Sequence, residues 1–240
     1  PVGCVGVCNQ TPLLEIVLGE NKHSRYTNVR KDQVEEILLK HIKPRSLNKR
    51  IRYRINDLAD SFLSDDMLYS PVNVPADQRE KYLNNFTRSQ IRLATADSGI
   101  ISPDSFDEYL LLGGFGALKK SLFFSKPDEI IYMITRSGLR GRGGAGFLTG
   151  RKWEISSKAS GSPRYVVCNG DEGDPGAFMD RMLLESFPYR IIEGMLIAGY
   201  ATGASEGIFY IRAEYPRAVT RVRNAIQQCY SNGFLGKNIL

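Results

Sequence analysis

Histidine and cysteine are scarce in this sequence, with two histidines and four cysteines among 240 residues. Two histidines leave little choice for a Ser-His-Asp or Cys-His catalytic constellation, and none is indicated. We interpret His23 and His41 as surface or packing residues. The cysteines are too few and too scattered for a disulfide scaffold, which favours reduced thiols or metal ligands.

Long apolar runs are also missing. No run approaches the roughly 18 residues that a membrane span requires, and no signal peptide is visible. We therefore expect a soluble, cytoplasmic protein that does not insert into a membrane. The remaining composition, 42% hydrophobic and 24% charged, is ordinary for one or two globular domains. The chain begins with Pro1 and ends at Leu240 without a closing element, so we expect a fragment.

The net charge of +6 is not spread evenly along the chain. Six basic residues and no acidic residue lie between Lys43 and Arg54. Such a run is usually a solvated linker or helix face, although an anionic partner would also suit it.

A glycine-rich, cationic stretch at residues 136–153 is the strongest signal in the sequence. Glycine lets a backbone reach positive φ and approach a ligand closely, and exposed N–H groups can then surround a phosphate. The glycines are Gly138, Gly141, Gly143, Gly144, Gly146 and Gly150, and the cations are Arg136, Arg140, Arg142, Arg151 and Lys152. A Gly-x-Gly-x-x-Gly pattern within the stretch is by itself weak support for a dinucleotide loop. The Arg-Gly-Arg-Gly-Gly segment also resembles sequences that bind single-stranded nucleic acid.

Hydrophobic periodicity predicts an alternation of strands and helices. The expected strands are residues 13–18, 24–28, 164–168 and 207–212, with 88–94 as a further candidate. The expected helices are residues 31–42, 102–112 with Ser102 as its cap, 116–122, one beginning at Lys126, 178–186, 189–200 and 216–231. The alternation after Trp153 predicts a mostly parallel sheet with helices outside it.

An acidic loop, residues 169–176, follows the predicted buried strand 164–168. Ligands of open α/β sheets lie at the carboxyl ends of the strands, so this loop and the glycine-rich stretch could enclose one ligand. Cations and N–H groups would bind phosphate, and carboxylates would bind ribose or amide groups, which suits a nucleotide or flavin nucleotide. The alternative is two unrelated turns. Calcium is disfavoured, because counting an EF-hand loop from Asp171 puts Gly173 and Pro175 at ligand positions.

The cysteines divide into two groups. Cys4 and Cys8 have a Cys-x₃-Cys spacing that could supply half of a four-thiolate iron–sulfur site, although two core cysteines are an equally good interpretation. Cys168 ends a predicted strand and Cys229 lies on a predicted helix, so we expect both to be core residues.

Three motifs in order, Gly-Leu-Arg-Gly-Arg-Gly-Gly-Ala-Gly-Phe147, Cys-Asn169-Gly-Asp-Glu-Gly-Asp-Pro-Gly and Ile-Arg-Ala-Glu214-Tyr-Pro-Arg, closely resemble a known family. It is the NADH-binding flavoprotein subunit shared by respiratory complex I, NAD-linked hydrogenases and NAD-dependent formate dehydrogenases. The resemblance implies an α/β fold in which residues 99–240 are the N-terminal part of a Rossmann-like FMN/NADH-binding domain. Residues 1–42 further resemble the C-terminal part of a thioredoxin-like [2Fe-2S] domain, with residues 43–98 as a basic linker and connecting segment.

The resemblance also implies an activity. Hydride passes between NAD(H) and FMN, and single electrons then pass to iron–sulfur clusters of a multi-subunit oxidoreductase, so the expected partners are other iron–sulfur subunits and NADH. The implied FMN- and NADH-binding residues are Gly141, Arg142, Gly143, Gly144, Gly146, Phe147, Lys152, Asn169, Asp171, Glu172 and Asp174, and the implied cluster ligands are Cys4 and Cys8. Within this set, the phosphate and ribityl chain belong to the loop around Arg142, Lys152 contacts the flavin, and Phe147 stacks on adenine.

The chain departs from the family pattern at two positions. Asp174 stands where many members have glutamate near the nicotinamide, and Ile155 stands where an aromatic residue often holds the adenine. Further FMN contacts and the cysteines of a [4Fe-4S] cluster are expected beyond Leu240. Two alternatives remain: a preference for NADPH, and a nucleic-acid-binding module that uses the Arg-Gly loop and the basic linker.

Overall fold

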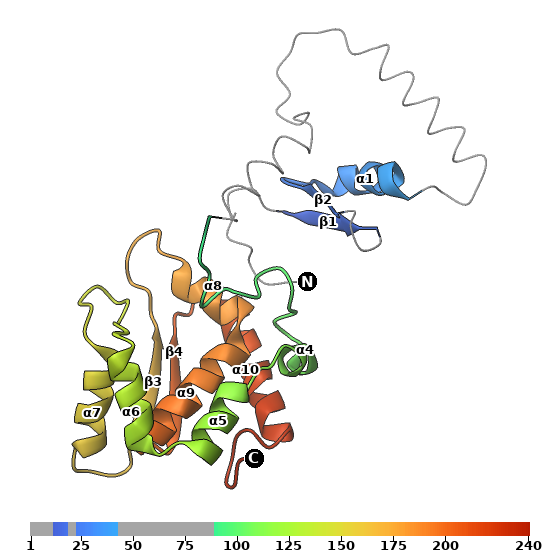
Figure 1. Ribbon diagram of the computed structural model, residues 1–240. Helices are drawn as coiled ribbons and strands as arrows, with labels where there is room; N and C mark the ends of the chain where they lie inside the picture. Colours follow the sequence, from blue (N-terminus) through green and yellow to red (C-terminus); the bar gives the residue numbers. More distant parts are fainter. Residues whose placement is uncertain (1–11, 19–22, 43–88) are drawn as a thin grey trace, which may run out of the picture. The chain divides into compact units, whose positions relative to one another are not determined.

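The computed structural model describes residues 12–18, 23–42 and 89–240 (Figure 1). The chain divides into two compact units, an N-terminal unit that extends to Arg92 and a C-terminal unit from Leu93 to Leu240. Among the described residues, no helix is both long enough and apolar enough to cross a membrane.

The described part of the N-terminal unit contains a hairpin and a helix. Strand β1 (Leu14–Val17) pairs antiparallel with β2 (His23–Tyr26), and a single 3-10 turn, η2 (Lys31–Gln33), leads into α1 (Val34–His41). The two predicted strands are therefore confirmed to within two residues. The predicted helix is confirmed as the 3-10 turn followed by α1.

The His41 side chain joins α1 to strand β2. Its Nε2 lies 2.5 Å from the hydroxyl oxygen of Tyr26, and the two rings meet edge to face. The interpretation of His41 as a packing residue is confirmed. Cys4, Cys8 and most of the predicted linker lie outside the described residues.

The C-terminal unit is an α/β arrangement built around a pair of parallel strands. In chain order its elements are α4 (Phe106–Leu111), α5 (Gly116–Phe124), α6 (Pro127–Arg136), α7 (Thr149–Lys158), β3 (Tyr165–Gly170), α8 (Met179–Ser186), α9 (Pro188–Thr202), β4 (Glu206–Ile211) and α10 (Pro216–Ser231). Strands β3 and β4 are parallel, with Tyr165 opposite Glu206 and Gly170 opposite Ile211. Helices α8 and α9 form the crossover between them (Figure 1). The predicted mixture of helices with a parallel sheet is confirmed.

One face of the strand pair is packed and the other is open. Cys168 and Phe209 pack against buried residues of α8 and α10. The alternate side chains point away, and each is about half exposed: Tyr165 49%, Val167 56%, Ile208 46% and Tyr210 58%. The strand expected at residues 164–168 is present, but the expectation that it is buried is wrong, because the described helices cover the sheet on one side.

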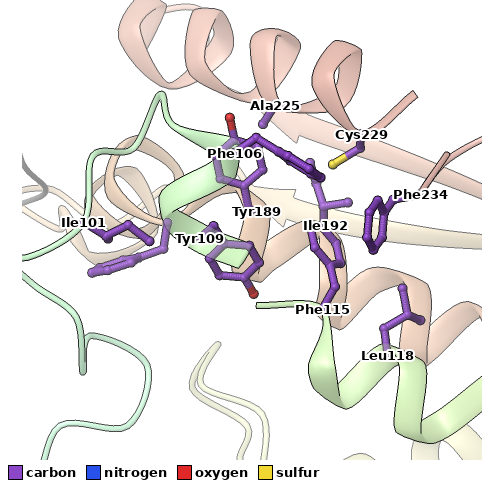
Figure 2. Packing of buried hydrophobic residues seen from close by; sticks show 11 residues of the cluster. Ile101, Phe106, Tyr109, Phe115, Leu118, Tyr189, Ile192, Ala225, Cys229 and Phe234 are labelled. Atoms are coloured by element: carbon purple, nitrogen blue, oxygen red, sulfur yellow. The ribbon is translucent and has the colours of Figure 1, made fainter. Parts of the chain in front are cut away.

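The main core is built from aromatic rings of α4, the turn before α5, α9 and the segment after α10. Figure 2 shows Phe106, Tyr109, Phe115, Tyr189 and Phe234 clustered together, and the contacting pairs have ring centroids 4.3 to 5.9 Å apart. Edge-to-face contacts between such rings add to the free energy gained by burying their area.

A buried carboxylate organises the turn between α4 and α5. Glu193 of α9 is 8% exposed and accepts hydrogen bonds from the Tyr109 hydroxyl (2.5 Å) and the backbone N–H groups of Phe115 (2.9 Å) and Leu118 (3.0 Å). Phe115 has a left-handed φ of 59°, which is unfavourable for a bulky residue. Burial and the neighbouring Glu193 raise the pKa of Tyr109, so its hydroxyl stays a donor.

Two sequence-based predictions need correction, and one helix was not predicted. The helix expected at residues 102–112 begins at Phe106, and its cap is Ser105 rather than Ser102, because the Ser105 hydroxyl accepts from the Glu108 N–H at 3.2 Å. Residues 89–94 form turns and irregular backbone instead of a strand. Helix α7 was not predicted, since its sequence continues a glycine-rich loop without an apolar stripe.

Candidate flavin-nucleotide site

The glycine-rich stretch forms a closed loop between two helices. It leaves α6 at Arg136 and enters α7 at Thr149. An antiparallel bridge joins Arg140 to Leu148, and the N–H groups of Gly141 and Thr149 donate across the base to the carbonyls of Phe147 and Leu139, both at 2.9 Å. Arg140 Nη1 also donates to the Gly146 carbonyl at 2.9 Å, so the base of the loop and one carbonyl of its tip are held in place.

The tip, residues 142–146, offers open backbone. Within the described part of the chain, none of its N–H groups donates a hydrogen bond. A Cβ built on Gly143 would meet nothing within 4 Å, and Gly144 and Gly146 have positive φ values of 99° and 61°. Unused N–H donors on a glycine-rich backbone are what an anion-binding loop requires.

The N-terminal turn of α7 carries only positive charge. The first turn of α7 has no acidic residue, whereas Arg151 and Lys152 lie within it and are exposed. No ion pair among the described residues includes Arg142 or Lys152. Because the helix dipole also makes an N-terminus positive, the loop and the first turn of α7 together favour an anion.

One glycine of the stretch has a different task. Gly150 lies inside α7, where an added Cβ would overlap the side-chain oxygen and the backbone of Thr135 in α6. It is buried, unlike the glycines of the tip. Gly150 therefore sets the close approach of α6 and α7, and the sequence pattern alone did not separate it from the ligand-facing glycines.

The acidic loop begins where β3 ends. Asn169 is the next-to-last residue of β3, and its Oδ1 accepts from the Asp171 N–H at 3.1 Å, which forms a tight turn. The Asp171 side chain is half-buried, and no hydrogen bond of the described chain uses its carboxylate. Asp174 is exposed, and its carbonyl accepts from the Ala177 N–H at 3.1 Å.

Glu172 differs from its neighbours because its side chain turns back into the protein. Its carboxylate accepts from the N–H groups of Asp180 (2.8 Å) and Arg181 (3.1 Å) at the start of α8, and its carbonyl accepts from Arg212. The Tyr215 hydroxyl donates to the same carboxylate at 3.3 Å. Burial and the nearby Glu172 raise the pKa of Asp180.

Both loops lie at the same end of the C-terminal unit, the end at which the parallel strands finish (Figure 1). No hydrogen bond or ion pair between residues 136–148 and 169–178, all of which the structure describes, joins the two loops directly. A cationic surface with free N–H donors and a loop with a free carboxylate thus share one end of the sheet, as expected from the sequence.

The remaining predicted residues fall into two groups. Phe147 has a half-exposed side chain and anchors the base of the loop through its carbonyl. Burial raises the pKa of Cys168 to about 11 and that of Cys229 to about 12, so both thiols stay protonated, as expected of packing residues. Cys4 and Cys8 lie outside the described residues, so their assignment as ligands stays a prediction.

The sequence did not predict that Arg212 and Tyr215 contact the acidic loop. Both were noticed only within a motif, and their contacts with Glu172 join segments 40 and 43 positions apart. The signal that could have found them was their place directly after a strand, where α/β proteins collect functional residues.

The two loops lie where the parallel strands end, which is the edge at which open α/β sheets usually bind their ligands. Residues 134–239 match the model of a family described as the Nuo51 FMN-binding domain.

Two curated relatives are similar to the chain. It is 49% identical over 152 residues to the NADP-reducing hydrogenase protein HndC of Solidesulfovibrio fructosivorans, with 63% of this chain and 31% of the relative covered. It is 52% identical over 136 residues to an NADH-quinone oxidoreductase subunit of Aquifex aeolicus (strain VF5), with 57% and 32% covered. The chain thus spans about a third of the length of these relatives.

A solved structure of an NAD⁺-reducing [NiFe]-hydrogenase in the air-oxidised state also aligns with the chain. The sequence identity is 27% and the TM-score is 0.47, with 65% of this chain and 28% of that chain covered.

Proposed function

We propose that this chain forms part of an NADH:acceptor oxidoreductase component that binds FMN between its two loops. The observation that carries the proposal is the tip of the glycine-rich loop, whose N–H groups are free and which lies beside the unpaired cations Arg142 and Lys152, all within the residues that match an FMN-binding family. FMN has one phosphate and a polyhydroxyl chain, so it needs clustered donors at one end and hydroxyl acceptors at the other.

The residues present fit this group. Gly141, Arg142 and Gly143, with Gly144 and Gly146, would surround the phosphate and the start of the ribityl chain, because the glycines have no Cβ where the ligand must approach. Lys152, in the positive first turn of α7, would contact the flavin. Asp171 has a free carboxylate that would accept hydrogen bonds from ribityl hydroxyls, with Asn169 beside it.

NADH would lie against the exposed residues of the same end. Phe147 would stack on the adenine, since its side chain is half exposed, and Asp174 would lie near the nicotinamide. When bound, FMN supplies hydride acceptance from NADH at N5 and one-electron release to iron–sulfur clusters. The protein's contribution is to bind, orient and tune these two molecules.

The assembly around this site extends the proposal. The names of the relatives describe parts of a hydrogenase and of an NADH-quinone oxidoreductase, so we place this chain in a multi-subunit oxidoreductase with iron–sulfur partners. We assign residues 1–42 to the end of a thioredoxin-like [2Fe-2S] domain, with Cys4 and Cys8 as two of its ligands. Residues 43–98 would connect it to the flavin domain at 99–240.

The Arg-Gly segment does not favour nucleic acid as the ligand. Segments of that kind act in disordered tracts, whereas this one occurs in a loop closed by hydrogen bonds between two helices.

The test is an absorption spectrum of the full-length protein before and after addition of NADH. A flavin band at about 450 nm that bleaches with NADH is the expected result. A well-folded protein without bound flavin, and without affinity for added FMN, would overturn the proposal.

A Gly143→Val variant tests the loop directly. The added Cβ meets no atom of the protein, and Gly143 does not have a positive φ, so folding should be unaffected. FMN binding should be lost, because valine would fill the space into which the phosphate fits. Stoichiometric FMN in this variant would show that the loop does not surround the phosphate.

A further inference from the structure

Glu172 holds an unfavourable backbone conformation inside the acidic loop. Its φ of 47° is left-handed, a region that residues with a Cβ avoid. The conformation must therefore be held by surrounding contacts. Two of them come from the first turn of α8, where the N–H groups of Asp180 and Arg181 donate to the Glu172 carboxylate. This arrangement caps α8 and ties it to the loop.

The other contacts come from the turn between β4 and α10. The Arg212 Nη1 donates to the Glu172 carbonyl at 3.1 Å, and the Tyr215 hydroxyl donates to the Glu172 carboxylate at 3.3 Å. Arg212 directly follows Ile211, which lies opposite Gly170 in the parallel pair. The bonds thus cross from the end of one strand to the loop that leaves the other.

The Tyr215 ring is itself fixed in place. It is 8% exposed and lies in a buried cluster with Leu184, Ala218 and Val222. A hydroxyl on a fixed ring has a defined position, so it can specify where the Glu172 carboxylate lies.

The fixed position of Glu172 also affects Asp171. It precedes Glu172, and its own carboxylate makes no hydrogen bond within the described chain. We propose that Arg212 and Tyr215 are positioning residues that lock Glu172, so that Asp171 presents its carboxylate to the ligand. Glu172 then acts on the loop and not on the flavin. This assignment rests on the proposed function, because Asp171 needs the flavin as its partner.

The test compares Arg212→Gln with Arg181→Gln in the full-length protein. Each variant removes one cation, one contact with the Tyr215 ring and one ion pair with a nearby glutamate, but only Arg212→Gln loses the side-chain bond to the Glu172 carbonyl. The backbone N–H of Arg181 still donates to Glu172 in the control. The readouts are the FMN dissociation constant from flavin fluorescence, the melting temperature, and hydrogen exchange in a peptide that contains residues 171–182.

Arg212→Gln should raise the FMN dissociation constant about tenfold, equivalent to about 1.4 kcal/mol, and should speed exchange in the 171–182 peptide. Its melting temperature should match that of Arg181→Gln, whose FMN affinity should stay within about twofold of the wild type. Equal FMN affinity of the two variants would overturn the assignment.

Tyr215→Phe keeps the ring packing and removes only the hydroxyl, so it separates positioning from stability. It should weaken FMN binding severalfold without lowering the melting temperature by more than the control does. Unchanged FMN affinity and unchanged exchange in this variant would refute a positioning role for Tyr215. A wild-type protein that binds no FMN would refute the proposed function. If hydrogen exchange at residues 180 and 181 is slow in that protein and faster in Arg212→Gln, Arg212 still holds Glu172 in place.

Discussion

Replacement of Gly150 by alanine tests whether the contact between α6 and α7 needs a missing side chain. Alanine is favoured over glycine inside a helix by about 1 kcal/mol, so propensity alone predicts stabilisation. The structure predicts the opposite, because the new Cβ would overlap the backbone N and Cα of Thr135 as well as its side-chain oxygen. Backbone atoms of a packed helix cannot move aside as a flexible side chain can.

The expected net effect follows from these two opposing terms. Overpacking of this kind typically costs about 1–3 kcal/mol, and contact with backbone atoms places Gly150→Ala at the upper end. After the gain in propensity, about 1–2 kcal/mol of destabilisation remains. At about 2–4 °C for each kcal/mol, the melting temperature should fall by roughly 2–8 °C. FMN affinity should also fall, since the overlap displaces the first turn of α7, which contains Lys152.

A matched control is available in α9. Gly194 also lies inside a helix, but a Cβ there would meet nothing within 4 Å, so Gly194→Ala should be stabilising by up to about 1 kcal/mol. Thermal unfolding of the two variants side by side measures the difference. Stabilisation of Gly150→Ala to the same extent as Gly194→Ala would refute the close-contact interpretation. Adding Thr135→Ala to Gly150→Ala should restore only part of the lost stability, because the overlap with the Thr135 backbone remains.

Three further predictions concern charged groups. Asp171→Asn should weaken FMN retention while leaving the melting temperature unchanged, and an equal loss of stability would indicate a structural role instead. Glu193→Ala should destabilise the protein by roughly 3–5 kcal/mol, because it leaves the Tyr109 hydroxyl and two N–H groups buried without an acceptor; chemical denaturation measures this, and a loss below about 1 kcal/mol would contradict it. Asp180 has a pKa raised above its ordinary 3.8, so the folded state binds its proton more tightly than the unfolded state does. Its ionisation therefore lowers stability as pH rises through the window above 3.8, and Asp180→Asn should raise the melting temperature at neutral pH but not below pH 3.8. A melting-temperature difference between this variant and the wild type that does not change with pH would contradict the raised pKa.

The elements with regular periodicity were predictable from the sequence. Helix α10 was expected at 216–231 and lies at Pro216–Ser231, and the strand expected at 207–212 lies at Glu206–Ile211. In both segments local propensity and apolar spacing favour the same structure, and α10 also has a proline at its start. The errors arose where two local signals compete, as at Ser102 and Ser105, each of which could cap a helix. There the reach of the Glu108 side chain to the Ser102 N–H decides the outcome.

The site was predictable only in part. Open glycines and free cations are visible in a sequence because they are unusual residues at close spacing. The distinction between Asp171 and Glu172 was not visible, since two adjacent carboxylates look alike until the contacts of each are known. It depends on donors from α8 and from the turn after β4, which no local pattern places near the loop.

The open face of the strand pair affects how the protein behaves in solution. Tyr165, Val167, Ile208 and Tyr210 form an apolar surface on two adjacent strands, and parallel sheets are ordinarily covered on both faces. A surface of this kind is adhesive, since two molecules that meet there release ordered water from both. The 240-residue chain on its own should therefore self-associate as its concentration rises. A segment or a partner that covers this face would prevent that association.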